Sequence, residues 1–347
     1  KFTNPAGRWC AYVDSDLLPR LHGFELMMAP YTIAHLKLGM TLKETGYSSF
    51  DRRLGIYLTN SLEEAESYDD TLFAGFGLSQ SIADEAREAG VIKRETPIMV
   101  VIGNPPYSGE SSNAHYTGND VYKVEPSGGK LQERNSKWLN DDYVKFIRFA
   151  ESMIEKTGEG IVAMITAHGY IDNPTFRGMR WHLMQTFDEI YILDLHGNVK
   201  KREKAPDGSK DGNIFDIQQG VAIIIAIKQK EKIGKEAKIF RADCFGTRET
   251  KFRYLETPFE EIKWEIISPT GDNLEWVVRD NKVAELYKQG FSVTEIFPVN
   301  SVCIVSGKDD EFIKFDKEQF SNANIDSNKI KPLSYRAFDT RYINYDP

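Results

Sequence analysis

The sequence predicts an α/β protein built on a doubly wound sheet. Short apolar runs rich in Val and Ile alternate with longer segments of helical periodicity between residues 21 and 227. The 347 residues are 41% hydrophobic and 28% charged, which is enough apolar material for a buried core. The length fits two ordinary domains, or one large α/β domain with an appendage. No window of about 18 apolar residues occurs, so the sequence predicts no membrane-spanning helix.

Six apolar runs are the predicted strands. Most of them are apolar almost throughout, which is typical of strands buried on both faces of a parallel sheet. The runs are 21–26, 54–58, 98–103, 160–166, 189–195 and 221–227.

Four segments between these runs are the predicted helices. They are 31–41, 82–88, 141–156 and 175–186. In 141–156, Val144, Ile147 and Met153 recur at roughly helical spacing, and Asn140 is a suitable N-cap.

The composition of the sequence changes after Lys230, where charged residues become more frequent and apolar runs become shorter. We therefore expect one domain over residues 1–235, and a mixed α+β linker or the start of a second domain over 236–347. Strand candidates in this later part, such as 301–305, have no helices between them. The chain begins without Met and without an apolar leader, and it starts and stops within a structural pattern. We therefore expect a piece of a longer protein.

Charge and cysteine content set limits on partners and compartment. Cys10, Cys244 and Cys303 lie far apart, without metal-ligand spacing or a disulfide framework, which favours a reducing cytoplasm. The six histidines show no metal spacing either, so we expect no metal. The net charge of −8 argues mildly against nucleic acid, although binding needs only a local basic groove.

The sharpest chemical signal is Asn104-Pro105-Pro106-Tyr107, directly after the run 98–103. A loop at the carboxyl end of such a strand lies where α/β sheets bind ligands. Two prolines fix the backbone, so the Asn104 amide oxygen and the Pro105 carbonyl can both act as acceptors beside the Tyr107 ring. This set suits a planar ring with an exocyclic amine. The alternative is a rigid strand-to-turn connection.

These four residues resemble motif IV of the amino-methyltransferases that use S-adenosylmethionine and methylate adenine or cytosine in DNA. The resemblance implies a Rossmann-like methyltransferase sheet, with Asn104 in both the catalytic and the cofactor site. Glutamine methyltransferases and some RNA enzymes carry the same tetrapeptide. An Asn in first place favours adenine N6 over cytosine N4.

Two further segments resemble cofactor motifs of this family. Glu25 is the next-to-last residue of the run 21–26, where a carboxylate can accept both hydroxyls of a ribose. The resemblance to motif II places Leu26 against the cofactor's adenine, and the resemblance to motif III gives Asn60 the adenine amine. A solvated Glu25 and a turn-capping Asn60 are the plain alternatives.

Two segments near residue 200 suggest contacts to DNA. Residues 213–222 resemble motif VIII, in which Phe215 would stack on the second face of a flipped base and Tyr107 on the first. A core position for Phe215 is about equally plausible. A charged loop could touch phosphates, although acidic residues within it also fit an ordinary solvated loop. Its basic residues are Lys200, Lys201, Arg202, Lys204 and Lys210.

Residues 21–38, 195–198 and 335–341 resemble the methyltransferase part of single-chain type ISP and large type II restriction-modification enzymes. In that family a nuclease and a helicase-like ATPase precede the methyltransferase, and a target-recognition domain follows. The family usually has Pro where this chain has Ala337. Its glycine-rich motif I is not found within residues 1–24, so we expect the first strand and that loop to precede Lys1.

Together the sequence predicts the catalytic core of a DNA adenine-N6 methyltransferase with S-adenosylmethionine as cofactor and double-stranded DNA as partner. A glutamine-N5 protein methyltransferase and a non-catalytic DNA-binding fragment are the alternatives. Without motif I, activity of this piece by itself is in doubt.

Overall fold

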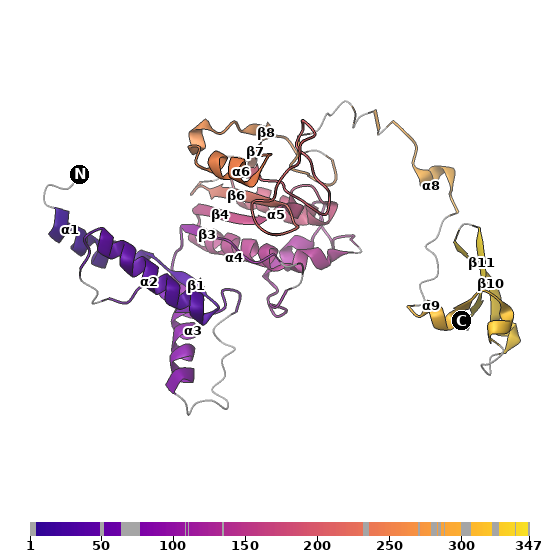
Figure 1. Cartoon of the computed structure of the whole chain (residues 1–347), viewed down its shortest axis with the longest axis horizontal. Coiled ribbons are helices and arrows are strands. Elements are labelled where there is room, and N and C mark those ends of the chain that lie inside the picture. The colour runs from indigo at the N-terminus through magenta and orange to yellow at the C-terminus, as the bar shows by residue number, and fades with distance from the viewer. Residues whose placement is uncertain are drawn as a thin grey trace. The chain divides into compact units, whose positions relative to one another are not determined.

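A computed structural model gives the structure of the chain. It describes residues 5–48, 52–63, 77–107, 109, 111–133, 135–231, 236–269, 271–278, 283, 286–287, 289–299, 307–320, 326–336 and 338–345. The chain divides into two compact units, Lys1–Val278 and Arg279–Pro347, which Figure 1 shows. No helix in the described part of the chain is long and apolar enough to cross a membrane.

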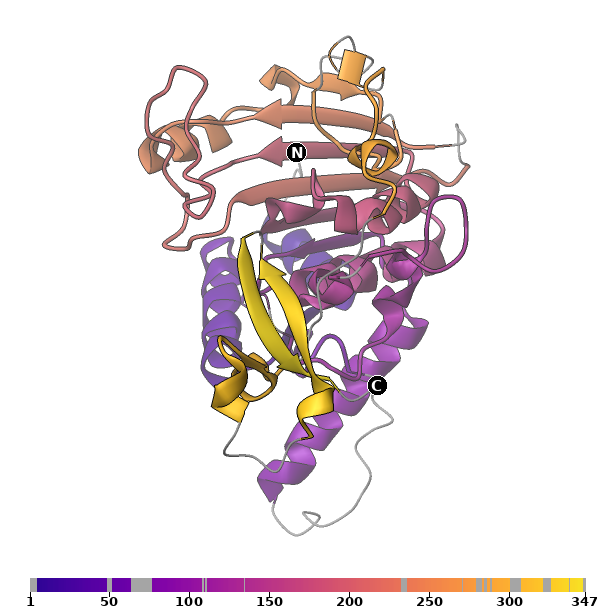
Figure 2. The ribbon, with the colours of Figure 1, turned by 90° about the vertical axis from the view of Figure 1, so that its right-hand side faces the viewer.

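The first unit contains a six-stranded sheet in the order β3-β4-β6-β5-β7-β8. Figure 2 shows its strands side by side. Strands β3 to β6 coincide with the last four predicted runs. The strands are β3 (Val100–Gly103), β4 (Gly160–Ala167), β5 (Glu189–Asp194), β6 (Val221–Lys228), β7 (Lys238–Asp243) and β8 (Glu265–Ile267).

The predicted parallel sheet is wrong in one respect, because this sheet is mixed. β3 pairs parallel with β4, and β5 pairs parallel with β7, but β6 lies between β4 and β5 and is antiparallel to both. The connection from β5 to β6 contains no helix among its residues, so the chain turns back at the edge where β5 ends. A strand that re-enters from the same edge must run antiparallel.

The first two predicted strands form a separate two-stranded parallel sheet. β1 (Gly23–Glu25) pairs with β2 (Ile56–Leu58). Around it lie α1 (Pro5–Tyr12), α2 (Met28–Glu44) and α3 (Gly77–Glu95), which Figure 1 draws beside the six-stranded sheet. Fewer apolar side chains are buried here than the sequence predicts, because α2 has no buried residue. The same holds for β3 of the six-stranded sheet, where Ile102 is 79% exposed.

The main core packs α4 (Asp142–Thr157) and α5 (Arg177–Thr186) against the sheet. Ile147 of α4, Leu183 of α5 and Ile224 of β6 belong to one cluster of buried apolar side chains. Removing such a buried side chain costs about 2–5 kcal/mol. The predicted cap of α4 is wrong by one residue, because Asp141 has the extended N-cap backbone while Asn140 ends a preceding 3-10 turn.

The predicted boundary at 235/236 falls within the sheet, because β7, β8 and α6 (Arg248–Leu255) all follow it. The compact units instead divide between Val278 and Arg279. β7 was not predicted, since Arg241 and Asp243 interrupt its apolar pattern. Both side chains serve a polar network described below.

The second unit is a small antiparallel sheet in the order β10-β11-β9. Residues 335–341, which the sequence analysis singled out, cover the turn of its hairpin, and the Arg341 guanidinium lies 4.0 Å from the centre of the Tyr335 ring. The predicted strand 301–305 lies outside the described residues. The elements are α8 (Val293–Ile296), α9 (Asp309–Phe312), β9 (Ile313–Lys314), β10 (Ile330–Arg336) and β11 (Asp339–Asn344).

Candidate active site at the carboxyl edge of the sheet

The loop Asn104-Pro105-Pro106-Tyr107 leaves the carboxyl end of β3, as predicted. Asn104 is exposed, and its amide makes no hydrogen bond to any residue that the structure describes. Pro105 is buried, and the half-buried Tyr107 ring packs against the main core. Burial raises the pKa of the Tyr107 phenol, which keeps it neutral at physiological pH. The loop therefore carries an exposed amide, without a hydrogen bond to the described residues, three positions before an aromatic ring that the core holds.

The N-terminus of α4 anchors the chain that follows Tyr107. Asp141 Oδ2 accepts a hydrogen bond from the Gly109 amide at 3.0 Å, and Asp142 Oδ1 accepts one from the Ser111 hydroxyl at 2.6 Å. Lys145 Nζ donates to Ser111 Oγ at 2.9 Å. None of these side chains was among the predicted site residues, because nothing in the spacing of the sequence indicates contacts across 31 to 34 residues.

Asp141 has an uncompensated oxygen. Its Oδ1 is buried and has no hydrogen-bond partner among the described residues. Burial raises the pKa of Asp141 to about 6, against the lowering effect of the hydrogen bond from Gly109.

The predicted cofactor residues lie at the ends of β1 and β2. Glu25 Oε1 accepts the Met27 amide at 3.0 Å, which makes a turn after β1, and Leu26 is 66% exposed. Asn60 Oδ1 accepts the Leu62 amide at 3.0 Å, the turn interaction that was its alternative role. Neither bond uses all the acceptor capacity of its side chain.

Asn60 is also linked to the loop after Tyr107. Its Nδ2 donates to Asn113 Oδ1 at 2.6 Å, and Asn113 Nδ2 donates to Asp142 Oδ1 at 2.9 Å. The structure therefore brings Asn60 and the segment that follows Asn104 to one place.

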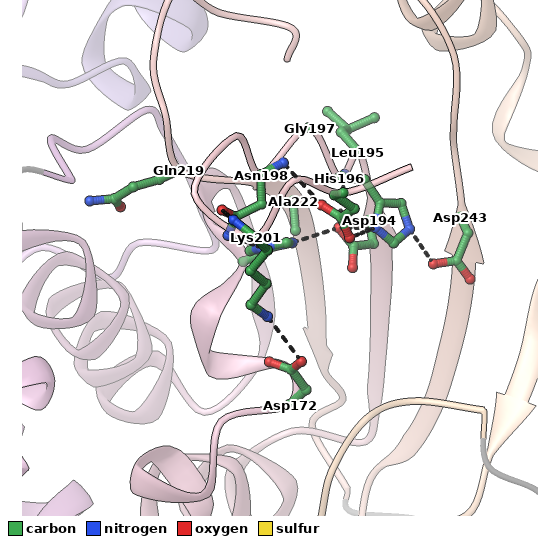
Figure 3. A network of polar contacts seen from close by, with 12 residues as sticks. Asp172, Asp194, Leu195, His196, Gly197, Asn198, Lys201, Gln219, Ala222 and Asp243 are labelled. Carbon is green, nitrogen blue, oxygen red and sulfur yellow. Dashed lines mark hydrogen bonds and ion pairs between the residues drawn. The ribbon is translucent and has the colours of Figure 1, made fainter. Parts of the chain in front are cut away.

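Phe215 is half-buried and packs against an apolar cluster that contains Leu193, Leu195 and Val221. Asn213 holds its segment, because Asn213 Nδ2 donates to the backbone oxygens of Gly197 and Gln219 at 2.9 and 2.6 Å. The basic loop is exposed at Lys200, Lys201, Arg202 and Lys204. Lys201 pairs with Asp172 at 3.3 Å (Figure 3).

A buried polar network lies at the same edge of the sheet, where β4, β5 and β7 end (Figure 3). Asp194 is its centre. Asp194 Oδ1 lies 3.1 Å from His168 Nδ1 and accepts the His196 amide at 3.0 Å, while Oδ2 accepts from Arg241 at 2.9 Å. Burial would raise the pKa of Asp194, but the bond from His168 and the neighbouring charges lower it. The carboxylate is therefore ionised.

His196 joins two further carboxylates. Its Nδ1 and Nε2 each lie 2.8 Å from an oxygen, of Glu203 and Asp243 respectively, and its ring stacks on Phe245. Burial would lower the pKa of His196, but the bonds to Asp243 and Glu203 raise it to about 9. The ring is therefore a cation that ties the loop after β5 to the end of β7. This network holds its backbone at a φ of 49°, a region unfavourable for a non-glycine residue.

His and carboxylate side chains gather closely enough to suggest ligands for a metal. The two groups within the network are His168, His196 and Glu203, and Asp194, His196 and Asp243; the third is Glu151, Glu155 and His182. In each group the ring nitrogens and carboxylates already pair with one another or with a guanidinium. A metal would have to displace these pairs.

Comparison with solved structures identifies the fold. The chain matches the DrdV–DNA complex with a TM-score of 0.66 at 22% identity, covering 97% of this chain and 38% of that one. It matches the ATP-dependent type ISP restriction-modification enzyme LlaBIII bound to DNA with a TM-score of 0.65 at 22% identity, covering 97% and 25%. It matches a nuclease-deletion mutant of the type ISP enzyme LlaGI with a DNA substrate mimic with a TM-score of 0.65 at 21% identity, covering 97% and 37%.

The chain thus spans less than two fifths of each of these larger enzymes. At 21–22% identity, the similarity of this chain to them is one of fold. Residues 21–200 match the model of the Eco57I restriction-modification methylase, and the chain belongs to that family. No curated protein matches it.

Proposed function

We propose that this chain is the catalytic core of a DNA methyltransferase that transfers a methyl group from S-adenosylmethionine to the N6 amine of a flipped adenine. The observation that supports this most directly is that the loop exposes the Asn104 amide, which has no hydrogen bond to a described residue, and holds the Tyr107 ring against the core. Membership in a restriction-modification methylase family supports the reaction class and double-stranded DNA as the substrate.

The loop would act by stabilising charge on the reacting nitrogen. The lone pair of an aromatic amine is conjugated into the ring, so the amine is a poor nucleophile. Asn104 Oδ1 and the Pro105 carbonyl would accept its two N–H bonds, favour a tetrahedral nitrogen and stabilise the positive charge that develops there. Pro106 keeps the backbone rigid, and Tyr107 would hold the ring for in-line attack.

The residues at the ends of β1 and β2 suit the nucleoside part of the cofactor. Glu25 has a carboxylate oxygen to spare for ribose hydroxyls, the exposed Leu26 offers an apolar face, and Asn60 retains acceptor capacity. Asn104 would border the methyl group. S-adenosylmethionine would supply an electrophilic methyl group. A glycine-rich loop for its methionine part is expected in a segment before Lys1, within a Rossmann-like sheet.

DNA would be held by stacking and by cations. Phe215 would cover the base face opposite Tyr107, and its half-buried position leaves part of the ring accessible. The loop with Lys200, Lys201, Arg202 and Lys204 would contact phosphates. We expect the complete protein to be cytoplasmic, with nuclease and ATPase domains before this part and a target-recognition domain after it.

The test is to express the complete protein in a methylation-free host and measure modified nucleosides in its DNA by mass spectrometry. We expect N6-methyladenine with the wild type and none with Asn104→Ala. Asn273→Ala is the matched control, since that side chain makes no hydrogen bond to a described residue, and it should leave methylation unchanged. Methylation by Asn104→Ala at the wild-type level would refute the role of the loop.

Two other results would change the conclusion. N4-methylcytosine would keep the mechanism and change the base. No modified base, from well-folded protein, would favour a glutamine methyltransferase or a non-catalytic DNA-binding part.

A further inference from the structure

Two cavities share one wall, and Gly109 and Ser111, which follow the Asn104–Tyr107 loop in the sequence, line one of them. The larger has a volume of about 730 Å³ and the smaller about 230 Å³. Trp138, Lys200 and Gln219 line both of them. Trp138 comes from the 3-10 turn Ser136–Asn140, and Lys200 and Gln219 come from the two ends of the connection between β5 and β6. The fold therefore assembles an aromatic ring, a cation and an amide from two segments that are distant in the sequence.

The three shared side chains remain available to a ligand, judged from the residues that the structure describes. The Trp138 side chain is exposed, with 40% of the residue accessible. Lys200 forms no ion pair and the Gln219 amide no hydrogen bond with any residue in the described ranges. Figure 3 shows Gln219 pointing away from the buried network around Asp194. An aromatic face, a free ammonium and a free amide are the groups that bind base, phosphate and base edge.

The larger cavity is positively charged although the whole chain carries −8. Lys123, Lys137, Lys145 and Lys200 line it, together with one acidic residue, Asp120, which pairs with Lys123 at 2.7 Å. The Lys137 ammonium lies 5.0 Å from the centre of the Trp138 ring. Such an exposed cation–π contact is weak, so a ligand can take the place of the ammonium. The freed ammonium then remains close enough to pair with an anion.

The smaller cavity has aromatic walls and a buried acceptor. Tyr143 and Phe176 line it and are almost fully buried, which gives a rigid apolar surface. Asp141 lines it too, and Oδ1 of this 4% exposed residue has no hydrogen-bond partner in the described part of the chain. A buried acceptor without a partner costs free energy unless a ligand supplies a donor. An amine or imide N–H of a nucleobase would supply one.

We infer that the two cavities together form a binding site for one DNA nucleotide whose base has left the stack, with the base in the smaller cavity and its phosphate in the larger. The inference rests on the proposed function for its choice of DNA. Residues 104–107 do not line the smaller cavity. The base held there is therefore not the adenine that Asn104 would hold, but a neighbour of it or its former pairing partner.

Binding of single-stranded DNA tests the site without requiring methylation. The probe is a fluorescent 12-mer, compared with the same strand made abasic, and the protein is the complete one. Trp138→Ala should weaken binding of the normal strand by about 5- to 150-fold, the range for one lost stacked base, and should not change binding of the abasic strand. Trp138→Phe should restore most of the affinity.

Lys200→Ala gives an independent readout. It should weaken both strands and lower the slope of log affinity against log salt by about 0.7, the value for one phosphate contact on a single strand. Lys230→Ala is the matched control, because Lys230 is exposed and follows the end of β6 at the opposite edge of the sheet. It should change neither quantity.

The proposal fails if Trp138→Ala weakens normal and abasic strands equally, or neither of them, while circular dichroism shows a folded protein. It also fails if Trp138→Ala lowers kcat for methylation more than tenfold at saturating DNA, since the cavity would then hold the reacting base. Loss of the proposed function looks different: a wild type that binds strands with these differences but modifies no DNA would refute the methyltransferase and leave the nucleotide site standing.

Discussion

Two regions at the same edge of the sheet differ in whether their polar side chains have hydrogen-bond partners. At the ends of β5 and β7, the buried Asp194, His196 and Asp243 are saturated with partners. At the end of β3 and along the shared cavity wall, Asn104, Gln219 and Oδ1 of Asp141 have none in the part of the chain that the structure describes. Paired polar groups in a protein interior fix its shape, whereas unpaired ones leave free energy to be gained from a ligand. The first region therefore supports the fold, and the second, which we name the working surface, is the one that we propose binds a ligand.

The largest expected effect breaks the paired region at its central cation. His196→Ala should lower the free energy of unfolding by about 3–5 kcal/mol, because it leaves Glu203 and Asp243 without their shared partner. Urea unfolding at pH 7, followed by circular dichroism, measures the change. His115→Ala, at an exposed histidine, is the control and should cost less than about 0.5 kcal/mol. A loss below 1 kcal/mol for His196→Ala would show that the network does not support the fold.

The second effect uses pH to titrate the same cation. The pKa of His196 is raised to about 9 from 6.5, so its contribution is fully present below pH 6.5 and is lost as pH rises through about 9. This corresponds to roughly 3 kcal/mol. Unfolding curves between pH 6 and pH 10 should show the decline in the wild type and a smaller one in His196→Gln. Parallel curves for the two proteins would contradict the assigned charge.

A third, smaller effect is expected in the unpaired region, where a substitution should raise the free energy of unfolding instead of lowering it. The pKa of Asp141 is raised to about 6 from 3.8, so folding favours its protonated form, and this stability is lost as pH rises through about 6. Asp141→Asn should therefore stabilise the fold at pH 8 by about 1–2 kcal/mol, and the gain should shrink toward pH 4. Thermal unfolding at both pH values checks it. Destabilisation by Asp141→Asn at pH 8 would show that the ionised carboxylate has a partner.

The smallest effects sharpen the contrast. Asn104→Ala and Gln219→Ala should each change the free energy of unfolding by less than about 0.5 kcal/mol, since neither amide has a described hydrogen-bond partner to lose. The same urea experiment measures both. A loss of more than about 1 kcal/mol in the free energy of unfolding for either variant would show that the residue stabilises the fold.

The sequence predicts strand positions better than strand directions. All six apolar runs are strands, because burial on a pleated surface selects Val and Ile whichever way the strand runs. The residues of β6 do not indicate that it runs antiparallel to its neighbours. The lack of a predicted helix between β5 and β6 did indicate this direction. β7 stayed hidden because Arg241 and Asp243 serve the polar network and break its apolar pattern.

The site was predictable only where its residues are contiguous. The loop from Asn104 to Tyr107 is read directly from the sequence, and it lies where the α/β pattern predicts. Trp138 meets Lys200 and Gln219 only because the turn before α4 converges with the connection between β5 and β6, and the spacing of residues in one sequence carries no information on that. Asp194 lies within the predicted strand 189–195, but its contact with His168 spans 26 residues and depends on the order of the strands.

The outer edge of β3 bears on how the chain will behave in concentrated solution. β3 is the last strand on its side of the sheet in the part of the chain that the structure describes, with Ile102 79% and Val100 55% exposed. Free backbone groups on an apolar edge strand are a template for pairing with another chain. Handled in isolation, residues 1–347 will therefore tend to self-associate and precipitate through this edge. A lysine at position 102, which places a charge on the edge, should raise the concentration at which the chain stays clear.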